Sequence, residues 1–315
     1  MSDICITLMV LFVVAVFYYG PRMIVTLSVC LISAYIIEFF CLKLIGQKKH
    51  EKYDYSPVIT SLIMTLLLSP AVPVWIPVVG MFVALCVAKF PFGGLGCNIF
   101  NPAAVGLGFL GICWPELVFK YCEPYSDLGL FAMDFVPKDS LLHTISNGGT
   151  PGIQFMNVIL GNFPGPAGAT PILILVACGI YLLLRKTISF SITFTLFITS
   201  SFFALVHQRV RTGTLDSLVY ETIAGILIFG TIFMASDPST IPRTISGRLI
   251  FGVLLGAFTM LFRYFGINEF GFIYALLITN ALSDFCDVYG KKLKKLFFDI
   301  LNLARMKIKQ FNLNE

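Results

Sequence analysis

The chain has 315 residues, of which 57% are hydrophobic and only 12% are charged, and its formal net charge is +5. A soluble domain carries about 25% charged residues because its surface must be wetted, so this composition excludes an ordinary soluble protein. The apolar residues occur in long blocks, and about 18 apolar residues suffice to cross the core of a bilayer. Because backbone polar groups in lipid must be satisfied within the segment, the spans are expected to be helices. The sequence therefore predicts an all-α polytopic membrane protein.

About ten membrane-spanning helices are predicted, five in each half of the chain. In chain order they cover residues 3–19, 23–45, 56–70, 72–90, 102–115, 168–185, 187–206, 217–235, 246–265 and 269–289. The first begins almost at Met1 without a basic stretch or a cleavage site, so it is interpreted as a retained span. Two halves, 1–115 and 168–290, are consistent with inverted five-helix repeats. A polar loop, 116–167, separates the halves, and a basic tail, 291–315, follows them.

Lysine and arginine in the short connections predict the orientation, because these residues collect on the cytoplasmic side. Most of them fall on the side of both termini, namely Lys43, Lys48, Lys49, Lys52, Lys89, Arg185, Lys186 and those of the tail. The acidic loop 116–167 is then external. Arg209 and Arg211 disagree, since they would also be external. The alternation of basic and apolar residues in the tail predicts an amphipathic helix on the anionic leaflet, with a solvated tail as the alternative.

The cysteines do not follow the spacing of a metal centre. There are nine of them, no two at C-x-x-C spacing, with three histidines in the whole chain. Most lie in apolar spans, where a free cysteine packs as a small hydrophobic residue. An iron–sulfur or zinc site within this chain alone is therefore not expected, and a cysteine shared with another subunit stays open. Nothing in the sequence indicates a nucleic-acid partner.

Three segments contain glycines and polar residues in patterns that neither a membrane span nor an ordinary loop requires. The first is residues 93–106, GGLGCNIFNPAAVG. Its glycines permit positive φ and close backbone approach. Asn101 and Pro102 are typical of a helix N-cap and first helical residue, and a helix N-terminus at membrane depth can hold an anion or polarised ring oxygens. Kinking of helices against their neighbours is the structural alternative.

The second and third segments are polar turns. The second segment is residues 236–243, SDPSTIPR, in which Asp237 can cap a helix. Arg243 and the following Arg248 offer positive charge. The alternative interpretation is a tight turn whose arginines follow the positive-inside rule. In residues 146–151, SNGGTP, the hydroxyl of Thr150 follows Gly148 and Gly149 and precedes a proline. Such a hydroxyl is accessible to a modifying enzyme, although composition alone indicates only a turn.

These segments resemble motifs of a known family. Residues 93–106 are similar to G-G-L-G-x-N-x-F-N-P-A-x-V-G in the membrane subunits of two redox-driven ion pumps, the D subunit of the Rnf complex and the B subunit of the sodium-pumping NADH:quinone reductase. Residues 234–238 resemble M-A-T-D-P, residues 247–252 resemble G-R-L-I-F-G, and Asn280 and Asp287 match in the last span. The Rnf D subunit is favoured because the chain begins directly with its first span, and the quinone-reductase B subunit is the alternative.

The resemblance implies a covalently bound FMN. In this family the FMN phosphate is attached to a threonine in D-x-x-S/T-G-A-T, and the matching residue is Thr150, with Gly148 for the first glycine. Thr144, Asn147 and Gly149 depart from the pattern. Thr170 follows a literal G-A and is the competing attachment site, but residues 161–170 align better with a separate family segment that opens the sixth span.

The resemblance also implies a function. Electrons pass between reduced ferredoxin and NAD⁺, and the transfer drives Na⁺ or H⁺ across the bacterial cytoplasmic membrane. The implied partners are subunits A, B, C, E and G and a flavin transferase, and the chain is not catalytic alone. A second, noncovalent flavin such as riboflavin is expected near the midplane, and Asn98, Asn101 and Asp237 are candidate cofactor-binding residues. Family members are similar in fold to urea-type channels, so a cofactor-free channel or transporter, or a scaffold that has lost its flavin, are the rival interpretations.

Overall fold

The computed structural model describes residues 1–46, 54–94, 96–126, 128–130, 135–149, 152–210, 213–223, 225–266 and 269–295. Within these ranges all regular secondary structure is helical, and the only β-type pairing is one isolated bridge between Tyr121 and Lys138. The all-α prediction is confirmed. The predicted tail helix falls mostly outside the described residues.

The helices follow the predicted order. The first half contains α1 (Ser2–Tyr19), α2 (Arg22–Ile45), α3 (Ser56–Leu67), α4 (Trp75–Cys86), the 3₁₀ turn η1 (Phe90–Phe92) and α5 (Pro102–Cys113). The second half contains α9 (Ile172–Leu184), α10 (Phe190–Val206), α11 (Thr214–Ile223), α12 (Leu227–Phe233), α13 (Ile245–Phe265) and α14 (Gly271–Ala281). Between them, the loop predicted at 116–167 carries the short helices α6 (Pro115–Val118), α7 (Leu141–Ser146) and α8 (Phe155–Leu160).

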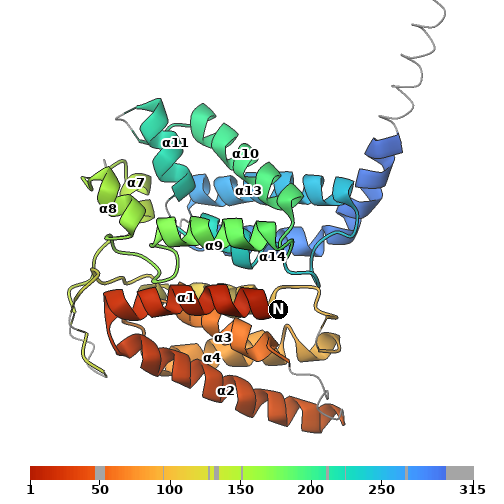
Figure 1. Cartoon of the computed structure of the whole chain (residues 1–315), viewed down its shortest axis with the longest axis horizontal. Coiled ribbons are helices and arrows are strands. Elements are labelled where there is room, and N and C mark those ends of the chain that lie inside the picture. The colour runs from red at the N-terminus through yellow and green to blue at the C-terminus, as the bar shows by residue number, and fades with distance from the viewer. Residues whose placement is uncertain are drawn as a thin grey trace, which may run out of the picture.

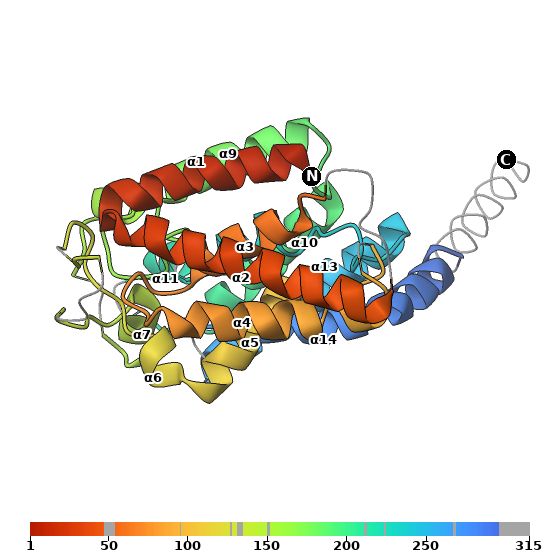
Figure 2. The ribbon, with the colours of Figure 1, turned by 90° about the horizontal axis from the view of Figure 1, so that it is seen from below.

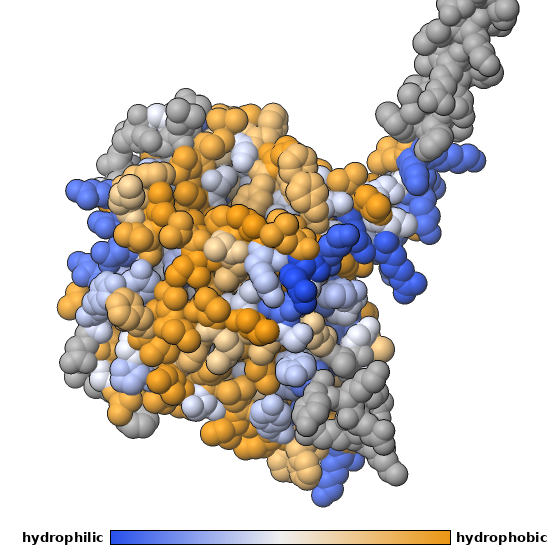
Figure 3. All heavy atoms as spheres, viewed as in Figure 1, coloured by the Kyte–Doolittle hydropathy of each residue, from blue (hydrophilic) through white to orange (hydrophobic). Residues whose placement is uncertain are grey.

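The length and composition of the helices fit a multi-pass membrane protein. Among the described residues, four helices are long and apolar enough to cross a bilayer, or five if the bent pair at the C-terminal end is one span, and four more apolar helices have 10–17 residues. Figure 3 shows apolar residues across the middle of one face and hydrophilic residues gathered toward its left and right edges. This is the distribution expected of a bundle whose flank lies in lipid and whose ends lie in water.

The two halves pack by the same plan. In the first, α2 contacts α3 and α4, and α4 contacts α5; in the second, α10 contacts α11 and α13, and α13 contacts α14. The halves meet where α1 lies along α9 and where α5 lies along α14, and α1 and α9 run side by side in both views (Figures 1 and 2). The shared plan is what two repeats require, and their inverted relation stays a prediction.

The ends of the bundle differ in character. The helices α7 and α8 and the loops around them lie at one end, at the left in Figure 1, and the N-terminal end of α1 faces the other. We call these the loop end and the terminal end. Close packing near the terminal end depends on small residues: a Cβ added at Gly252 of α13 would overlap Thr195 Oγ1 and lie 2.8 Å from the Ile192 carbonyl oxygen of α10. Glycine at this position therefore sets the distance between the two helices.

Two predicted spans are not continuous. The span at 217–235 is divided into α11 and α12, and Gly225 between them has φ +73°. The span at 269–289 ends at Ala281, and a helix covering 283–295 continues at an angle of 66° to α14. The bend has a physical cause, because the carboxylate of Asp287 accepts hydrogen bonds from the backbone N–H groups of Arg243 (2.8 Å) and Thr244 (2.9 Å). The last helix is thereby held against the N-terminus of α13.

Candidate functional site

The glycine segment forms a turn that leads into α5. Gly93, Gly94 and Gly96 have φ of +107°, +87° and +82°, values that a residue with a side chain rarely adopts. Asn101 is in extended conformation, and its Oδ1 accepts a hydrogen bond from the Ala104 N–H at 3.2 Å. Asn101 is therefore the N-cap of α5 and Pro102 its first residue, as predicted from the sequence.

A buried lysine fixes the start of this turn. Lys89, which is 1% exposed, lies 3.4 Å from Glu38 of α2 and 3.3 Å from Asp54, and its carbonyl oxygen accepts a hydrogen bond from the Gly94 N–H at 3.1 Å. From the sequence, Lys89 is expected to be a loop charge. Because a buried charge without its partners is costly, the two carboxylates hold Lys89 in place. The hydrogen bond from the Gly94 N–H to the Lys89 carbonyl oxygen then fixes the start of the glycine turn.

The second motif forms a turn between α12 and α13. Asp237 Oδ1 accepts hydrogen bonds from the Ser239 N–H (3.2 Å) and the Ser239 hydroxyl (2.8 Å). The hydroxyl of Ser236 accepts a hydrogen bond from the Ser189 N–H before α10. Burial raises the pKa of the Asp237 carboxyl, and the two hydrogen bonds from Ser239 oppose the shift. A partly desolvated acid therefore stands at a fixed place in the turn.

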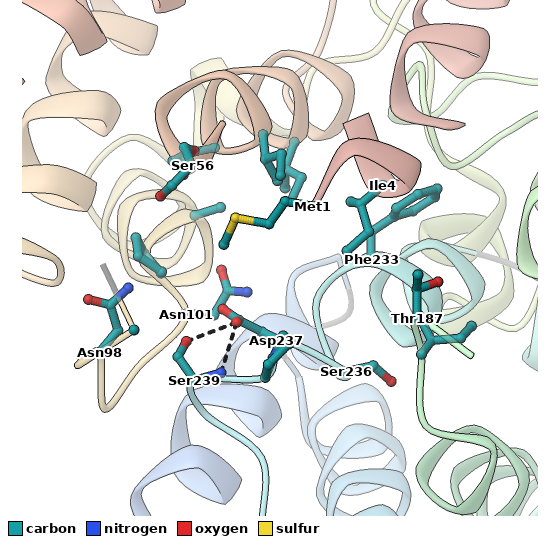
Figure 4. Close-up of a pocket in the computed structure, with 18 of the residues that line it drawn as sticks. Met1, Ile4, Ser56, Asn98, Asn101, Thr187, Phe233, Ser236, Asp237 and Ser239 are labelled. Atoms are coloured by element: carbon teal, nitrogen blue, oxygen red, sulfur yellow. Dashed lines mark hydrogen bonds between the residues drawn. The ribbon is translucent and has the colours of Figure 1, made fainter. Parts of the chain in front are cut away.

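The two motifs, more than 130 positions apart in the sequence, line one cavity of about 350 Å³ (Figure 4). Asn98 and Asn101 come from the glycine segment, and Asp237 and Ser239 from the second turn. Asn98 is 6% exposed, and its Oδ1 has no hydrogen-bond partner within the part of the chain that the structure describes. A buried acceptor without a partner beside a cavity indicates a place for a ligand or a water molecule.

The remaining walls of the cavity are apolar. They are formed by α1, α3, α5 and α12, with Ile63, Ile232 and Phe233 among the lining residues. Apolar walls with a few convergent polar groups are typical of sites for small organic ligands. Met1 also lines the cavity, so the site lies at the terminal end of the bundle (Figure 4).

The arginines of the second motif do not line this cavity. The guanidinium of Arg248 donates a hydrogen bond to the Pro242 carbonyl oxygen at 2.9 Å, and Arg243 bonds to Asp287 through its backbone. The expectation that they offer positive charge at the site is therefore not met. Asn280 is absent from the cavity lining as well, although its amide is 1% exposed and without a partner among the described residues.

The third motif is the C-terminal end of α7. The Gly148 N–H donates to the Ile145 carbonyl oxygen and the Gly149 N–H to the Thr144 carbonyl oxygen, each at 3.0 Å, and Gly148 has φ +73°. This is a Schellman motif, in which glycine is favoured because the chain must turn left-handed. Gly148 is exposed at the loop end. Thr150 itself and Pro151 lie outside the described residues.

The competing threonine is inside the protein. Thr170 is 1% exposed, and a Cβ at Gly161 would lie 2.7 Å from its carbonyl carbon. A modifying enzyme does not reach this hydroxyl in the folded chain. The candidate attachment turn and the cavity between the first two motifs are separate, since α7 and Gly148, which precede Thr150, lie at the loop end.

Comparison with known proteins identifies the family. The sequence matches the profile described as "NQR2, RnfD, RnfE family" over residues 1–294. The chain belongs to this family. The match covers every span and both motifs that line the cavity, so the resemblance inferred from those motifs is confirmed.

Relatives in this family share most of the chain. The D subunit of the proton-translocating ferredoxin:NAD(+) oxidoreductase complex of Clostridium ljungdahlii is 30% identical over 304 residues, which cover 93% of this chain and 90% of the relative. The D subunit of the Na(+)-translocating ferredoxin:NAD(+) oxidoreductase complex of Acetobacterium woodii is 28% identical, covering 93% and 88%. The D subunit of the ion-translocating oxidoreductase complex of Haemophilus influenzae (strain 86-028NP) is 27% identical, covering 91% and 90%.

Sequence reasoning missed several charged residues in this family member. Glu38 lies inside the predicted span 23–45, where a charge is a signal that a partner exists, and Lys89, counted as a loop charge, stands at the end of the span 72–90. Glu221 pairs with Arg209 through two hydrogen bonds, and the buried Glu269 follows α13. Glu269 carries no sequence signal, because it stands at the edge of a span, where acidic residues are ordinary.

Proposed function

We propose that this chain is the D subunit of an Rnf-type complex, which couples electron transfer between ferredoxin and NAD⁺ to transport of Na⁺ or H⁺ across the bacterial cytoplasmic membrane. The observation that carries the proposal is the match over residues 1–294 together with a cavity built from both family motifs. One relative is named as proton-translocating and another as Na(+)-translocating, so the ion is left open. Subunits A, B, C, E and G are the expected partners.

The proposed orientation places both termini in the cytoplasm. The C-terminal ends of α2 and α9, which carry Lys43 and Arg185, lie at the terminal end, whereas α6, which carries Glu116, and α7 lie at the loop end (Figures 1 and 2). This agrees with the positive-inside rule. The Thr150 turn would then face outward.

The proposal includes FMN attached through its phosphate to Thr150. The Schellman turn supports it, because Gly148 and Asn147 before the threonine are exposed and leave room for a flavin transferase. The burial of Thr170 disfavours the alternative attachment site. A bound flavin would supply the electron-accepting ring, while the protein supplies position and electrostatics.

A second, noncovalent flavin such as riboflavin is proposed for the cavity at the terminal end. The residues fit such a ring system: apolar walls from Ile63 and Phe233 face a polar edge formed by Asn98 and Asp237. The unpartnered Asn98 Oδ1 would accept a hydrogen bond from a ring N–H. Asn101 would contribute as the cap of α5, because the first N–H groups of this helix would stabilise a partial negative charge on the ligand.

The experiment is a flavin inventory of the complex purified after coexpression with its transferase. We expect a yellow preparation in which peptide mapping finds FMN on the peptide with Thr150, and in which denaturation releases a further flavin. Asp237→Leu is expected to lower the released flavin and leave the covalent FMN unchanged. A colourless preparation without ferredoxin-dependent reduction of NAD⁺ would overturn the proposal and favour a channel or a flavin-free scaffold.

A further inference from the structure

A second cavity lies at the loop end and belongs to neither motif. Its volume is about 450 Å³, and it is lined by residues of α5, the α6 region, α7 and the start of α14. Asp139 and His143, both exposed, stand at its rim. The cavity is thus in contact with the surrounding water, and its polar lining gives water molecules partners inside it.

Glu269 is a buried residue that lines this cavity. It lies in the connection between α13 and α14 and is 9% exposed. One carboxylate oxygen, Oε1, accepts a hydrogen bond from the hydroxyl of Ser140, and the other, Oε2, has no partner among the residues that the structure describes. The fully buried hydroxyl of Tyr121 lies beside the same carboxyl and lacks a hydrogen bond of ordinary geometry within the described residues. Among the described residues, therefore, one oxygen of this carboxyl is still available for a proton or a hydrogen bond.

Charged and titratable groups face Glu269 from every element packed against it. They are Asp139 before α7, His143 in α7, Tyr121 after α6, Tyr274 of α14, Arg263 of α13 and, next to Arg263, Glu221, Arg209 and Tyr264. Arg209 is neutralised by Glu221, and Arg263 donates a hydrogen bond to the Glu221 carbonyl oxygen. Burial raises the pKa of the Glu269 carboxyl, while the Ser140 hydrogen bond and the electrostatic influence of His143 and Arg263 oppose the shift.

We propose that Glu269, with Ser140 and Tyr121, forms a proton-binding site that exchanges protons with the outer water through this cavity. The site is separate from both proposed flavins and does not depend on them. Its binding step is simple, since a proton from water adds to the carboxylate and leaves again by the same route. The charge of the Glu269 carboxyl would therefore follow the pH on one side of the membrane.

The lining favours a proton over a metal cation. Hard cations are held by several oxygen ligands at once, whereas the only buried carboxylate in this cavity lining is that of Glu269. A proton needs only the one oxygen that has no partner among the described residues.

The site is joined to α7 through one hydroxyl. Ser140 is the N-cap of α7, because its Oγ accepts a hydrogen bond from the His143 N–H at 3.0 Å, and the same hydroxyl donates to Glu269. A change of charge at Glu269 therefore acts directly on the hydrogen bond that begins α7. Ser140→Ala is expected to leave the Glu269 carboxyl in place and to remove the hydrogen bond to its Oε1.

The test is infrared difference spectroscopy on the complete complex in its membrane, recorded while the external pH is changed. We expect a carbonyl stretch of a protonated carboxylic acid that titrates above the ordinary range of glutamate. It is lost in Glu269→Gln, shifted in frequency in Ser140→Ala, and kept in Glu116→Gln, which removes an exposed acid at the same end.

Three outcomes would overturn the proposal. The first is a signal that persists in Glu269→Gln. The second is a signal that ignores external pH, which would make Glu269 a sealed structural acid. The third is a titration that moves with Na⁺ concentration at constant ionic strength, which would make the site a cation site. If Glu269→Gln does not assemble, the frequency shift in Ser140→Ala decides. Flavin fluorescence of the same samples reports separately on the proposed function.

The same residue predicts how stability depends on pH. Because the folded state raises the pKa of Glu269 above its unfolded value of about 4.3, folding favours the protonated carboxyl. Its contribution to stability is fully present below the unfolded pKa and is lost as pH rises through the folded pKa. We expect the thermal midpoint of the wild-type complex to fall relative to that of Glu269→Gln across this window. Parallel curves for the two proteins would contradict the raised pKa.

Discussion

Thr150→Ala is expected to remove all covalently bound flavin from this protein. A phosphoester to FMN needs a side-chain hydroxyl, and alanine has none. In-gel flavin fluorescence after denaturing electrophoresis is the measurement, and the band at the mass of this chain is expected to disappear. Ferredoxin-dependent reduction of NAD⁺ is expected to fall to background, because the electron path would lose one carrier. Thr150→Ser keeps the hydroxyl and should retain part of the fluorescence.

The matched control for this variant is Thr170→Ala. Thr170 follows the literal G-A sequence of the family motif, yet its side chain is buried against the body of the protein. The control is expected to keep full fluorescence. Loss of fluorescence in Thr170→Ala together with its retention in Thr150→Ala would reverse the assignment of the attachment site, and a wild-type chain without fluorescence would leave no covalent flavin to assign.

Glu221→Gln is expected to produce the largest loss of stability. Arg209 Nε and one terminal nitrogen lie 2.6 Å and 2.9 Å from the two oxygens of Glu221, whose side chain is fully buried. Arg263 is buried next to them. Removing the negative charge leaves buried positive charge without compensation, which costs about 3–5 kcal/mol. Thermal unfolding of the purified complex, and the amount of this protein recovered in membranes, are the measurements.

The contrast for this prediction is an exposed ion pair at the same end. Glu123 lies 3.3 Å from Lys138, but both side chains are about half exposed, 60% and 49%. Water screens such a pair, so Glu123→Gln is expected to cost at most about 1 kcal/mol. The double change Arg209→Met with Glu221→Gln should restore part of the stability, because it removes both members of the buried pair. Equal losses in Glu221→Gln and Glu123→Gln would disprove the buried-network interpretation.

This network also explains the exception that Arg209 makes in the predicted orientation. Arg209 is positive and falls at the loop end, against the positive-inside rule. In the structure it is paired with Glu221, donates a hydrogen bond to the Arg263 carbonyl oxygen at 2.9 Å and lies 5.0 Å from the Tyr264 ring. A charge neutralised inside the protein does not act as a free loop charge. The rule concerns charges that meet the membrane surface, so Arg209 does not count against the orientation.

Local sequence rules predicted the parts that depend on neighbours along the chain. Helix lengths follow from runs of apolar residues, the start of α5 follows from Asn101 and Pro102, and the turn at Gly148 follows from its glycines, although the helix α7 before it was not predicted. Each of these rules joins atoms only a few positions apart. The family motifs showed that residues 93–106 and 234–238 resemble segments of known redox subunits. They did not show that the two segments lie next to each other in space.

Only the tertiary structure decided which distant residues meet. It brought Asn98 and Asp237 to the lining of one cavity, buried Thr170, held the last helix against α13 through Asp287, and brought Ser140 to Glu269 across 129 positions. The physical reason is that burial and pairing of polar groups depend on how helices pack against one another. Helix packing is fixed by contacts between whole faces, such as the approach of α10 to Gly252, and no local pattern contains that information.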